Sequence, residues 1–167
     1  MSVEKRAYTM AKIAVGNPED ALDLVQDAMT AFVTRYVDRS EDDWPALFFR
    51  ILQNGIRDWY RRSRVRNRWR VWFNRSDDQG DDILESIPDD KGVDPVAQLS
   101  NEGLNDAIIK ALKMLPVRQQ QVFLLRIWEG LSVAETATAM VCSQGSVKTH
   151  LSRALQALKS RLDEYQL

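Results

Sequence analysis

The 167-residue chain contains very little of the residue types from which most catalytic and metal sites are built. It has one cysteine and one histidine, Cys142 and His150. A lone cysteine cannot form an internal disulfide. One cysteine and one histidine cannot supply the four ligands of a structural zinc site, and they leave no spare residues for a Cys/His or Ser/His/Asp catalytic set. A single cysteine also fits a reducing compartment. We therefore expect a cytoplasmic protein that uses no metal or cofactor and is not an enzyme.

Long hydrophobic runs are also missing. No apolar stretch approaches the ~18 residues that a membrane span needs, and the first residues lack the apolar segment of a secretory signal. Apolar residues nevertheless make up 44% of the chain and charged residues 28%, which is typical of a protein that forms a core. Because the apolar residues recur at helical spacing and β-branched alternation is absent, the predicted fold is all-α.

The net charge of −1 hides two blocks of opposite sign. Residues 57–75 contain eight arginines against one acid, and residues 77–94 contain eight acids against one lysine. Charges separated by more than ~10 Å are largely screened from each other, so the blocks act separately. A near-neutral total therefore does not exclude nucleic acid as a partner.

The acidic block is predicted to be a flexible linker. It has no apolar periodicity, and it combines glycine, proline and dense like charge, so it buries too little to offset its conformational entropy. This divides the chain into a helical domain at 1–75, a linker at 76–94 and a second helical domain at 95–167.

Three helices are expected in the first domain. A first helix covers about residues 3–15. Asn17 caps a second helix that begins with Pro18, whose missing N–H costs nothing at that position. Trp44-Pro45 opens a third, which continues into the arginine block. The apolar stripe predicted to bury the second helix consists of Leu22, Val25, Met29, Phe32, Val33 and Tyr36.

The second domain is expected to contain a helix-turn-helix. A helix that starts at Asp94-Pro95 ends at Pro116, and the next one turns Val122, Leu125 and Trp128 inward. Ser132 and Glu135 have the spacing of a capping box, and Ser143 can cap a last amphipathic helix shortly after the previous one ends near 140. Two helices joined by a short turn, the second long, match the helix-turn-helix layout.

Polar and basic side chains cover the outward face of that last helix. A DNA major groove admits such a helix, and Arg or Lys can bind guanine there. The simpler interpretation is a solvated helix face, and the caps and the tight turn favour the DNA interpretation. The residues predicted to contact duplex DNA are Ser146, Lys148, Thr149, Ser152 and Arg153.

Aromatic residues are interleaved with the arginine block. Trp59, Tyr60, Trp69, Trp72 and Phe73 lie among the arginines, and proteins that bind single strands combine stacking aromatics with phosphate-binding cations. The alternative is that these aromatics belong to the core and the arginines are only solvated. On the polar side of the same helix, Gln53 and Asn54 either read a splayed base or face water.

Three motifs in this order resemble bacterial RNA polymerase sigma factors of the small extracytoplasmic-function group. The segment 18–28, PEDALDLVQDA, resembles the helix with which these proteins bind the polymerase clamp. Residues 44–62 resemble the stretch that reads and opens the minus-ten promoter element. Residues 115–154 are similar to the domain that binds the minus-thirty-five element. The two predicted domains would be sigma region 2, with three helices, and sigma region 4, with the helix-turn-helix.

The resemblance implies a role for each of three residue sets. Asp23, Gln26, Asp27 and Thr30 would bind core RNA polymerase. Trp44, Asn54, Arg57, Trp59, Arg61 and Arg62 would bind the minus-ten single strand, with Asn54 near a flipped base and the loop 38–44 beside it. Ser146, Lys148, Thr149, Ser152 and Arg153 would enter the major groove. The implied partners are core polymerase and promoter DNA, often with an anti-sigma factor, and the acidic linker would thread polymerase channels.

Two other interpretations remain open from the residues. A helix-turn-helix regulator that works without polymerase would bind duplex DNA alone, usually as a dimer on two half-sites. A nucleic-acid-processing enzyme would need clustered acids for metals or a nucleophile beside a base, and most clustered acids here lie in the linker.

Overall fold

The computed structural model describes residues 3–72 and 101–163, with side chains described for 3–65 and 106–163. Every regular element in these ranges is helical, which confirms the all-α prediction. The predicted linker, and the predicted helix start at Asp94-Pro95, lie outside them. The elements are α1 (Val3–Val15), α2 (Pro18–Tyr36), the 3₁₀ turn η1 (Glu41–Asp43), α3 (Trp44–Trp72), α4 (Asn101–Lys113), α5 (Val117–Phe123), the π-helical turn η3 (Leu124–Trp128), α6 (Val133–Met140) and α7 (Gln144–Asp163).

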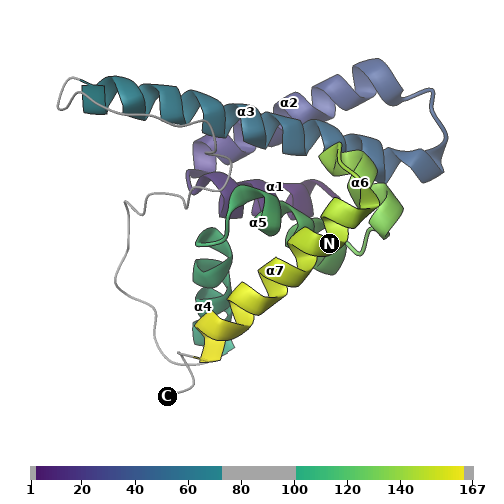
Figure 1. Ribbon diagram of the computed structural model, residues 1–167. Coiled ribbons are helices and arrows are strands. Elements are labelled where there is room, and N and C mark those ends of the chain that lie inside the picture. The colour runs from purple at the N-terminus through teal and green to yellow at the C-terminus, as the bar shows by residue number, and fades with distance from the viewer. Residues whose placement is uncertain (1–2, 73–100, 164–167) are drawn as a thin grey trace.

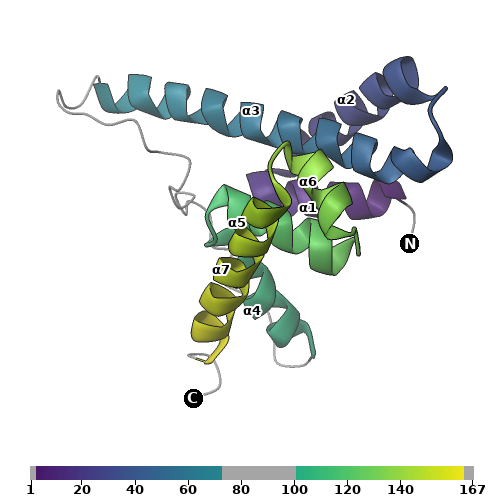
Figure 2. The same cartoon turned by 45° about the vertical axis from the view of Figure 1, so that its right-hand side comes forward.

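The long helix α3 spans the molecule and contacts both halves of the chain. It packs against α1 and α2 on one side and against α6 of the helix-turn-helix on the other (Figure 1). Its C-terminal end extends past the other helices, which is visible in both orientations (Figure 2). The projecting end of α3 therefore contains part of the basic block.

Local sequence signals set the arrangement of the first three helices. The Asn17 side chain accepts hydrogen bonds from the backbone N–H groups of Glu19 and Asp20 at 2.8 and 3.3 Å, which confirms the predicted cap. Gly55 then allows α3 to approach α2 closely, because a Cβ atom at this position would lie 3.2 Å from Leu24 Cδ2. A glycine inside a helix lowers helix propensity, and here the close packing offsets that cost.

The predicted apolar stripe of α2 is only partly buried. Leu22, Met29 and Val33 are exposed, at 47%, 39% and 60%, so their assignment to the core was wrong. The buried face contains two alanines, one valine and one leucine instead. The buried residues of α2 are Ala21, Leu24, Val25 and Ala28.

The helix-turn-helix forms where the sequence predicts it. The backbone N–H of Ser132 donates to Glu135 at 2.6 Å and the N–H of Glu135 donates to the Ser132 hydroxyl at 3.2 Å, which completes the capping box. Val141 ends α6 in the left-handed region at φ 52°, a strained conformation for a β-branched residue. The Ser146 N–H donates to the Ser143 hydroxyl at 3.0 Å and so caps α7.

A π-helical turn moves Trp128 to the surface, contrary to the prediction that it points inward. Over Leu124–Trp128 the backbone hydrogen bonds skip one extra residue, as in the bond from Glu129 N–H to the Leu124 carbonyl at 3.0 Å. The inserted residue shifts the helical phase. Trp128 is therefore 42% exposed, and the side chain of Glu129 turns inward instead.

One buried apolar cluster runs through both halves of the chain, with members from α1, α2 and α3 and from α4 to α7. Polar contacts also cross between the halves. Arg6 of α1 forms a salt bridge with Glu129 at 3.1 Å. The Gln121 side chain donates to the backbone carbonyl of Gln53 at 3.4 Å. The two predicted domains are thus packed face to face, and their division at 75 and 95 stays a prediction.

Substitution of Ser132 by Ala tests the capping box. We expect the change to cost about 1 kcal/mol of unfolding free energy at neutral pH, measured by chemical denaturation followed by circular dichroism. The hydrogen bonds with Ser132 hold the pKa of Glu135 below its usual range. The cap therefore contributes fully above the ordinary carboxyl pKa and weakens as the pH falls through the lowered one.

The loss caused by Ser132→Ala should accordingly shrink in acid. The matched control is Ser160→Ala, at an exposed position inside α7. A loss that keeps the same size as the pH is lowered from 7 until Glu135 is protonated would contradict the role of the Glu135 carboxylate.

Candidate nucleic-acid and partner interface

The first predicted set lies together on the open surface of α2. Asp23, Gln26, Asp27 and Thr30 are all exposed. The exposed Leu22, Met29 and Val33 lie next to them on the same helix. Sequence reasoning missed these three as surface residues, because an apolar stripe at helical spacing looks the same whether it faces a core or an absent partner. The result is a helix face with an apolar stripe and an acidic edge.

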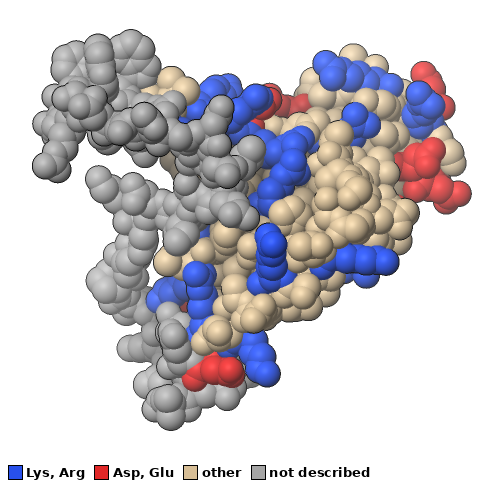
Figure 3. Space-filling model, in the orientation of Figure 1, with Lys and Arg blue, Asp and Glu red and all other residues tan. Residues whose placement is uncertain are grey.

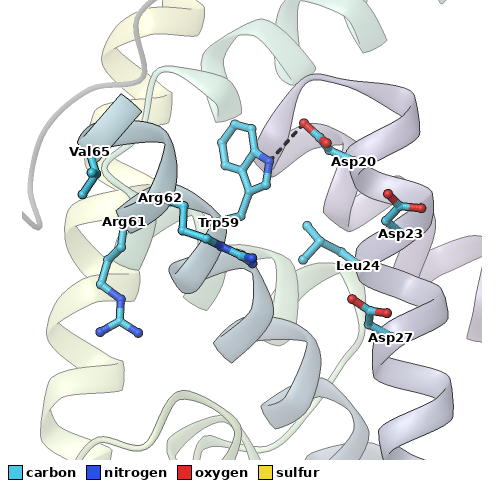
Figure 4. A pocket seen from close by; sticks show the side chains of 8 residues that line it. All are labelled: Asp20, Asp23, Leu24, Asp27, Trp59, Arg61, Arg62 and Val65. Atoms are coloured by element: carbon cyan, nitrogen blue, oxygen red, sulfur yellow. Dashed lines mark hydrogen bonds between the residues drawn. The ribbon is translucent and has the colours of Figure 1, made fainter. Parts of the chain in front are cut away.

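A groove of about 580 Å³ lies between this acidic edge and α3 (Figure 4). The structure thus brings together members of two predicted sets, polymerase-binding Asp23 and Asp27 and strand-binding Trp59, Arg61 and Arg62. In the close-up, the Arg62 side chain extends toward α2, whereas Arg61 points away from it. The complete lining consists of Asp20, Asp23, Leu24, Asp27, Trp59, Arg61, Arg62 and Val65.

Trp59 and Trp44, two of the predicted strand-binding aromatics, form hydrogen bonds and ring contacts within the protein. The indole N–H of Trp59 donates to Asp20 Oδ2 at 3.0 Å, and its ring packs edge-on against Tyr60. The Trp44 ring packs edge-on against Phe32, and its N–H donates to the Arg39 carbonyl at 3.0 Å. These contacts fix both rings in place, and base stacking by either ring stays a prediction. The side chains of Trp69 and Trp72, and Phe73, lie outside the described residues.

Asn54 and Arg57 lie on the side of α3 that faces the second half of the chain. Both are half-buried, and the Arg57 guanidinium donates to the Asn54 side-chain oxygen. Burial, followed by the nearby Arg118, lowers the pKa of Arg57. The adjacent Gln53 is buried at 1% exposure and donates to Met10 Sδ at 2.9 Å. The expectation that Gln53 lies on the polar side of the helix was therefore wrong.

The predicted duplex-binding residues share the open side of α7. Lys148, Thr149, Ser152 and Arg153 are exposed, and Ser146 is half-buried. The hydroxyls of Ser146 and Thr149 already bond within the turn and helix, to the Ser143 hydroxyl at 2.9 Å and the Gly145 carbonyl at 3.0 Å. Lys148 and Arg153 therefore have the longest reach from this face.

Most of the charged side chains on the face of the molecule shown in Figure 3 are basic. Lys and Arg lie over α3 and along α7 with few acids between them. Acidic side chains gather instead at the end where α2 and α3 are connected, which contains Glu41, Asp42 and Asp43 of η1. Such a separation favours a polyanion on the α3–α7 face.

Comparison with known proteins shows which family has this sequence and geometry. The profile of the family described as "Sigma-70, region 4" matches residues 105–158, which span the helix-turn-helix. The RNA polymerase sigma-E factor of Streptomyces antibioticus is 31% identical over 149 residues, covering 89% of this chain and 74% of that protein. The chain belongs to the extracytoplasmic-function sigma factors of bacterial RNA polymerase.

Other relatives match nearly the whole of this chain. The sigma-E factor of Streptomyces coelicolor is 30% identical, covering 91% of this chain and 77% of its own. The ECF sigma factor SigF of Caulobacter vibrioides is 28% identical, covering 97% and 81%. As a sigma factor, the chain directs the initiation of transcription by RNA polymerase.

A solved structure shares the fold. The sigma factor RpoE from Bartonella quintana, crystallised with the anti-sigma factor NepR, superposes with a TM-score of 0.62 and 23% identity, over 96% of this chain and 92% of that one. Among the described residues of this sigma factor, none of the helices is long and apolar enough to cross a membrane. The same residues hold no group of three or more His, Cys, Asp or Glu side chains placed to bind a metal ion.

Substitution of Arg153 by Ala tests the predicted base contact. If Arg153 binds a guanine edge, the change should cost about 1–3 kcal/mol of promoter binding by the holoenzyme, concentrated at one base position of the upstream element. Competition binding with single-base variants of the promoter measures this. Lys159→Ala removes the same charge from an exposed position further along α7 and should have little effect. An equal loss on every sequence would instead indicate a phosphate contact.

Proposed function

We propose that this sigma factor binds core RNA polymerase through the exposed face of α2, reads the upstream promoter element with α7 and holds the melted non-template strand with α3. The observation that carries the proposal is the α2 face. It exposes three large apolar side chains beside carboxylates on a helix whose opposite side is buried.

An apolar stripe of this kind favours a helical partner. Leu22, Met29 and Val33 follow one another at spacings of seven and four residues, which is the pattern of a helix that packs into a groove or against another helix. Contiguous exposed apolar surface mostly marks interaction sites. Asp23 and Asp27 border the stripe, so basic side chains on the polymerase would complete the contact and orient it.

The two DNA-binding surfaces differ in what they can read. The exposed side of α7 suits the major groove of duplex DNA, where its basic residues reach base edges. The arginines of α3, with Asn54 and Arg57, suit an unpaired strand held by its phosphates with one base bound separately. Together they fit a protein that positions polymerase on duplex DNA and then retains an opened strand.

The remaining parts of the proposal follow from family membership. We expect the protein to act in the cytoplasm, without enzymatic activity or a cofactor of its own. The structural relative from Bartonella quintana was solved with an anti-sigma factor, and we propose a protein of this class as a partner here. The acidic segment 76–94 is proposed to follow polymerase channels that otherwise hold nucleic acid.

The deciding experiment combines the purified chain with bacterial core RNA polymerase. Co-elution in gel filtration, followed by discrete new transcripts from a genomic fragment library, is the expected result and would also reveal the promoter elements. Absence of co-elution, with tight binding of duplex fragments by the protein alone, would favour a regulator that acts without polymerase.

Substitution of Asp27 by Ala tests the α2 interface directly. Asp27 is exposed and lines the groove, so both halves should fold normally. We expect about tenfold weaker association with core polymerase, measured by fluorescence anisotropy of labelled protein. Asp163→Ala removes the same charge from the end of α7 and serves as the control. Unchanged affinity for Asp27→Ala would remove this residue from the interface.

A further inference from the structure

The end of α3 that contains the candidate strand-binding arginines extends beyond the apolar core. Ile56, at 1% exposure, is the last buried residue among the α3 side chains that the structure describes. From residue 57 to residue 65, every described side chain is half-buried or exposed. The close apolar packing that fixes a protein interior therefore ends before Arg61 and Arg62, and other contacts must set the direction of this part of the helix.

Two adjacent aromatic residues connect this end of α3 to the first two helices. The indole N–H of Trp59 donates to Asp20 Oδ2 of α2 at 3.0 Å (Figure 4). The hydroxyl of Tyr60 donates to the backbone carbonyl of Ala14, near the end of α1. The two aromatic rings pack edge-on against each other, with their centroids 5.2 Å apart. Neighbouring residues of α3 are thus held by two different helices.

Asp20 belongs to none of the predicted binding sets. It lies in the first turn of α2, where the helix dipole stabilises a carboxylate, and it is half-buried. A hydrogen bond to an ionised acceptor is stronger than one between neutral groups. The carboxylate of Asp20 is therefore well suited to hold the Trp59 indole in one orientation.

The bond between Asp20 and Trp59 lies between two candidate binding surfaces. Asp23, which is predicted to bind polymerase, follows Asp20 by three residues on the same side of α2. Arg62, which is predicted to bind the strand, follows Trp59 by three residues on the same side of α3. All four residues line the groove between the two helices (Figure 4). A change in the direction of α3 at this point would move the arginines relative to the acidic edge of α2.

We propose that Asp20 and Trp59 are positioning residues, whose hydrogen bond fixes the direction of the strand-binding end of α3 relative to the polymerase-binding face of α2. The melted strand is then held at a defined place relative to polymerase. This inference rests on the proposed function, which gives the two surfaces their roles. It assigns Trp59 a role inside the protein in place of the base stacking that the sequence predicts. Loss of the bond should therefore impair promoter opening and spare the binding steps before it.

The test compares variants of the full chain, assembled with core polymerase, on a promoter fragment recovered from the genomic library. Trp59→Phe keeps an aromatic ring that can stack on a base and removes the N–H donor. Asp20→Ala removes the acceptor, whereas Asp20→Asn retains an oxygen that can accept the same bond. Glu19→Ala is the matched control, because it removes an exposed carboxylate from the same turn of α2. The rate of opening is measured by the permanganate reactivity of unpaired thymines.

We expect Asp20→Ala and Trp59→Phe each to slow opening by about fivefold, which is the scale of one hydrogen bond to a charged group. The double variant should open no more slowly than either single variant, because both changes remove the same bond. Asp20→Asn and Glu19→Ala should open within about twofold of the wild-type rate. The affinity for core polymerase, and that of the holoenzyme for the upstream duplex, should stay within about twofold in every variant.

A wild-type opening rate in either single variant would overturn the positioning role, since the bond would then not limit opening. Losses that multiply in the double variant would also overturn it, because the two residues would act separately. A loss in Glu19→Ala equal to that in Asp20→Ala would assign the effect to charge at the helix end. A fall in core or duplex affinity as large as the fall in opening rate would indicate a general loss of structure.

Failure of the proposed function gives a different result. The wild-type chain would then neither co-elute with core polymerase nor yield transcripts, and the positioning role would be rejected with it. When the wild type does co-elute and opens the promoter, only the comparison among the variants decides whether the bond between α2 and α3 positions the strand.

Discussion

Gln53 lies in the middle of α3 at 1% exposure, and both halves of the chain bond to it. Its amide donates to Met10 of α1, and its backbone carbonyl accepts from Gln121 of α5. Most buried polar groups form hydrogen bonds, and the two partners of Gln53 come from segments more than forty residues away in each direction. These two contacts join α1 and α5 through the middle of α3, and the packing of α6 on α3 and the shared apolar cluster hold the same arrangement.

Local features of the fold could be predicted from the sequence because their causes are local. The cap at Asn17, the capping box at Ser132 and the turn before α7 each depend on residues within a few positions of one another. Periodicity was less informative. It could not reveal that Leu22 faces solvent, because apolar residues at helical spacing look the same whether they face a core or an absent partner. Nor could it reveal the phase shift at η3, which has no compositional signal of its own.

The candidate surfaces also differ in whether local sequence predicts them. The open side of α7 is a property of one helix, and its predicted residues lie together as expected. The groove between α2 and α3 depends on the approach of two helices, so the grouping of Asp27 with Arg62 was beyond the reach of sequence reasoning. The burial of Gln53 depends on elements from both halves and was predicted wrongly. The surroundings of a residue are thus harder to predict from sequence when more segments of the chain form them.

The π-helical turn Leu124–Trp128 sets the direction of the Glu129 side chain without involving any residue of α6 or α7. A π-helical turn corresponds to one residue inserted into an α-helix. Loss of that residue would restore the α-helical phase and rotate Glu129 away from Arg6, while the sequences of α6 and α7 stayed intact. The candidate duplex-binding face of α7 and the Arg6–Glu129 contact between the halves are therefore encoded by different stretches of the gene. A deletion of one codon would therefore remove a contact between the halves and leave every residue of that face unchanged.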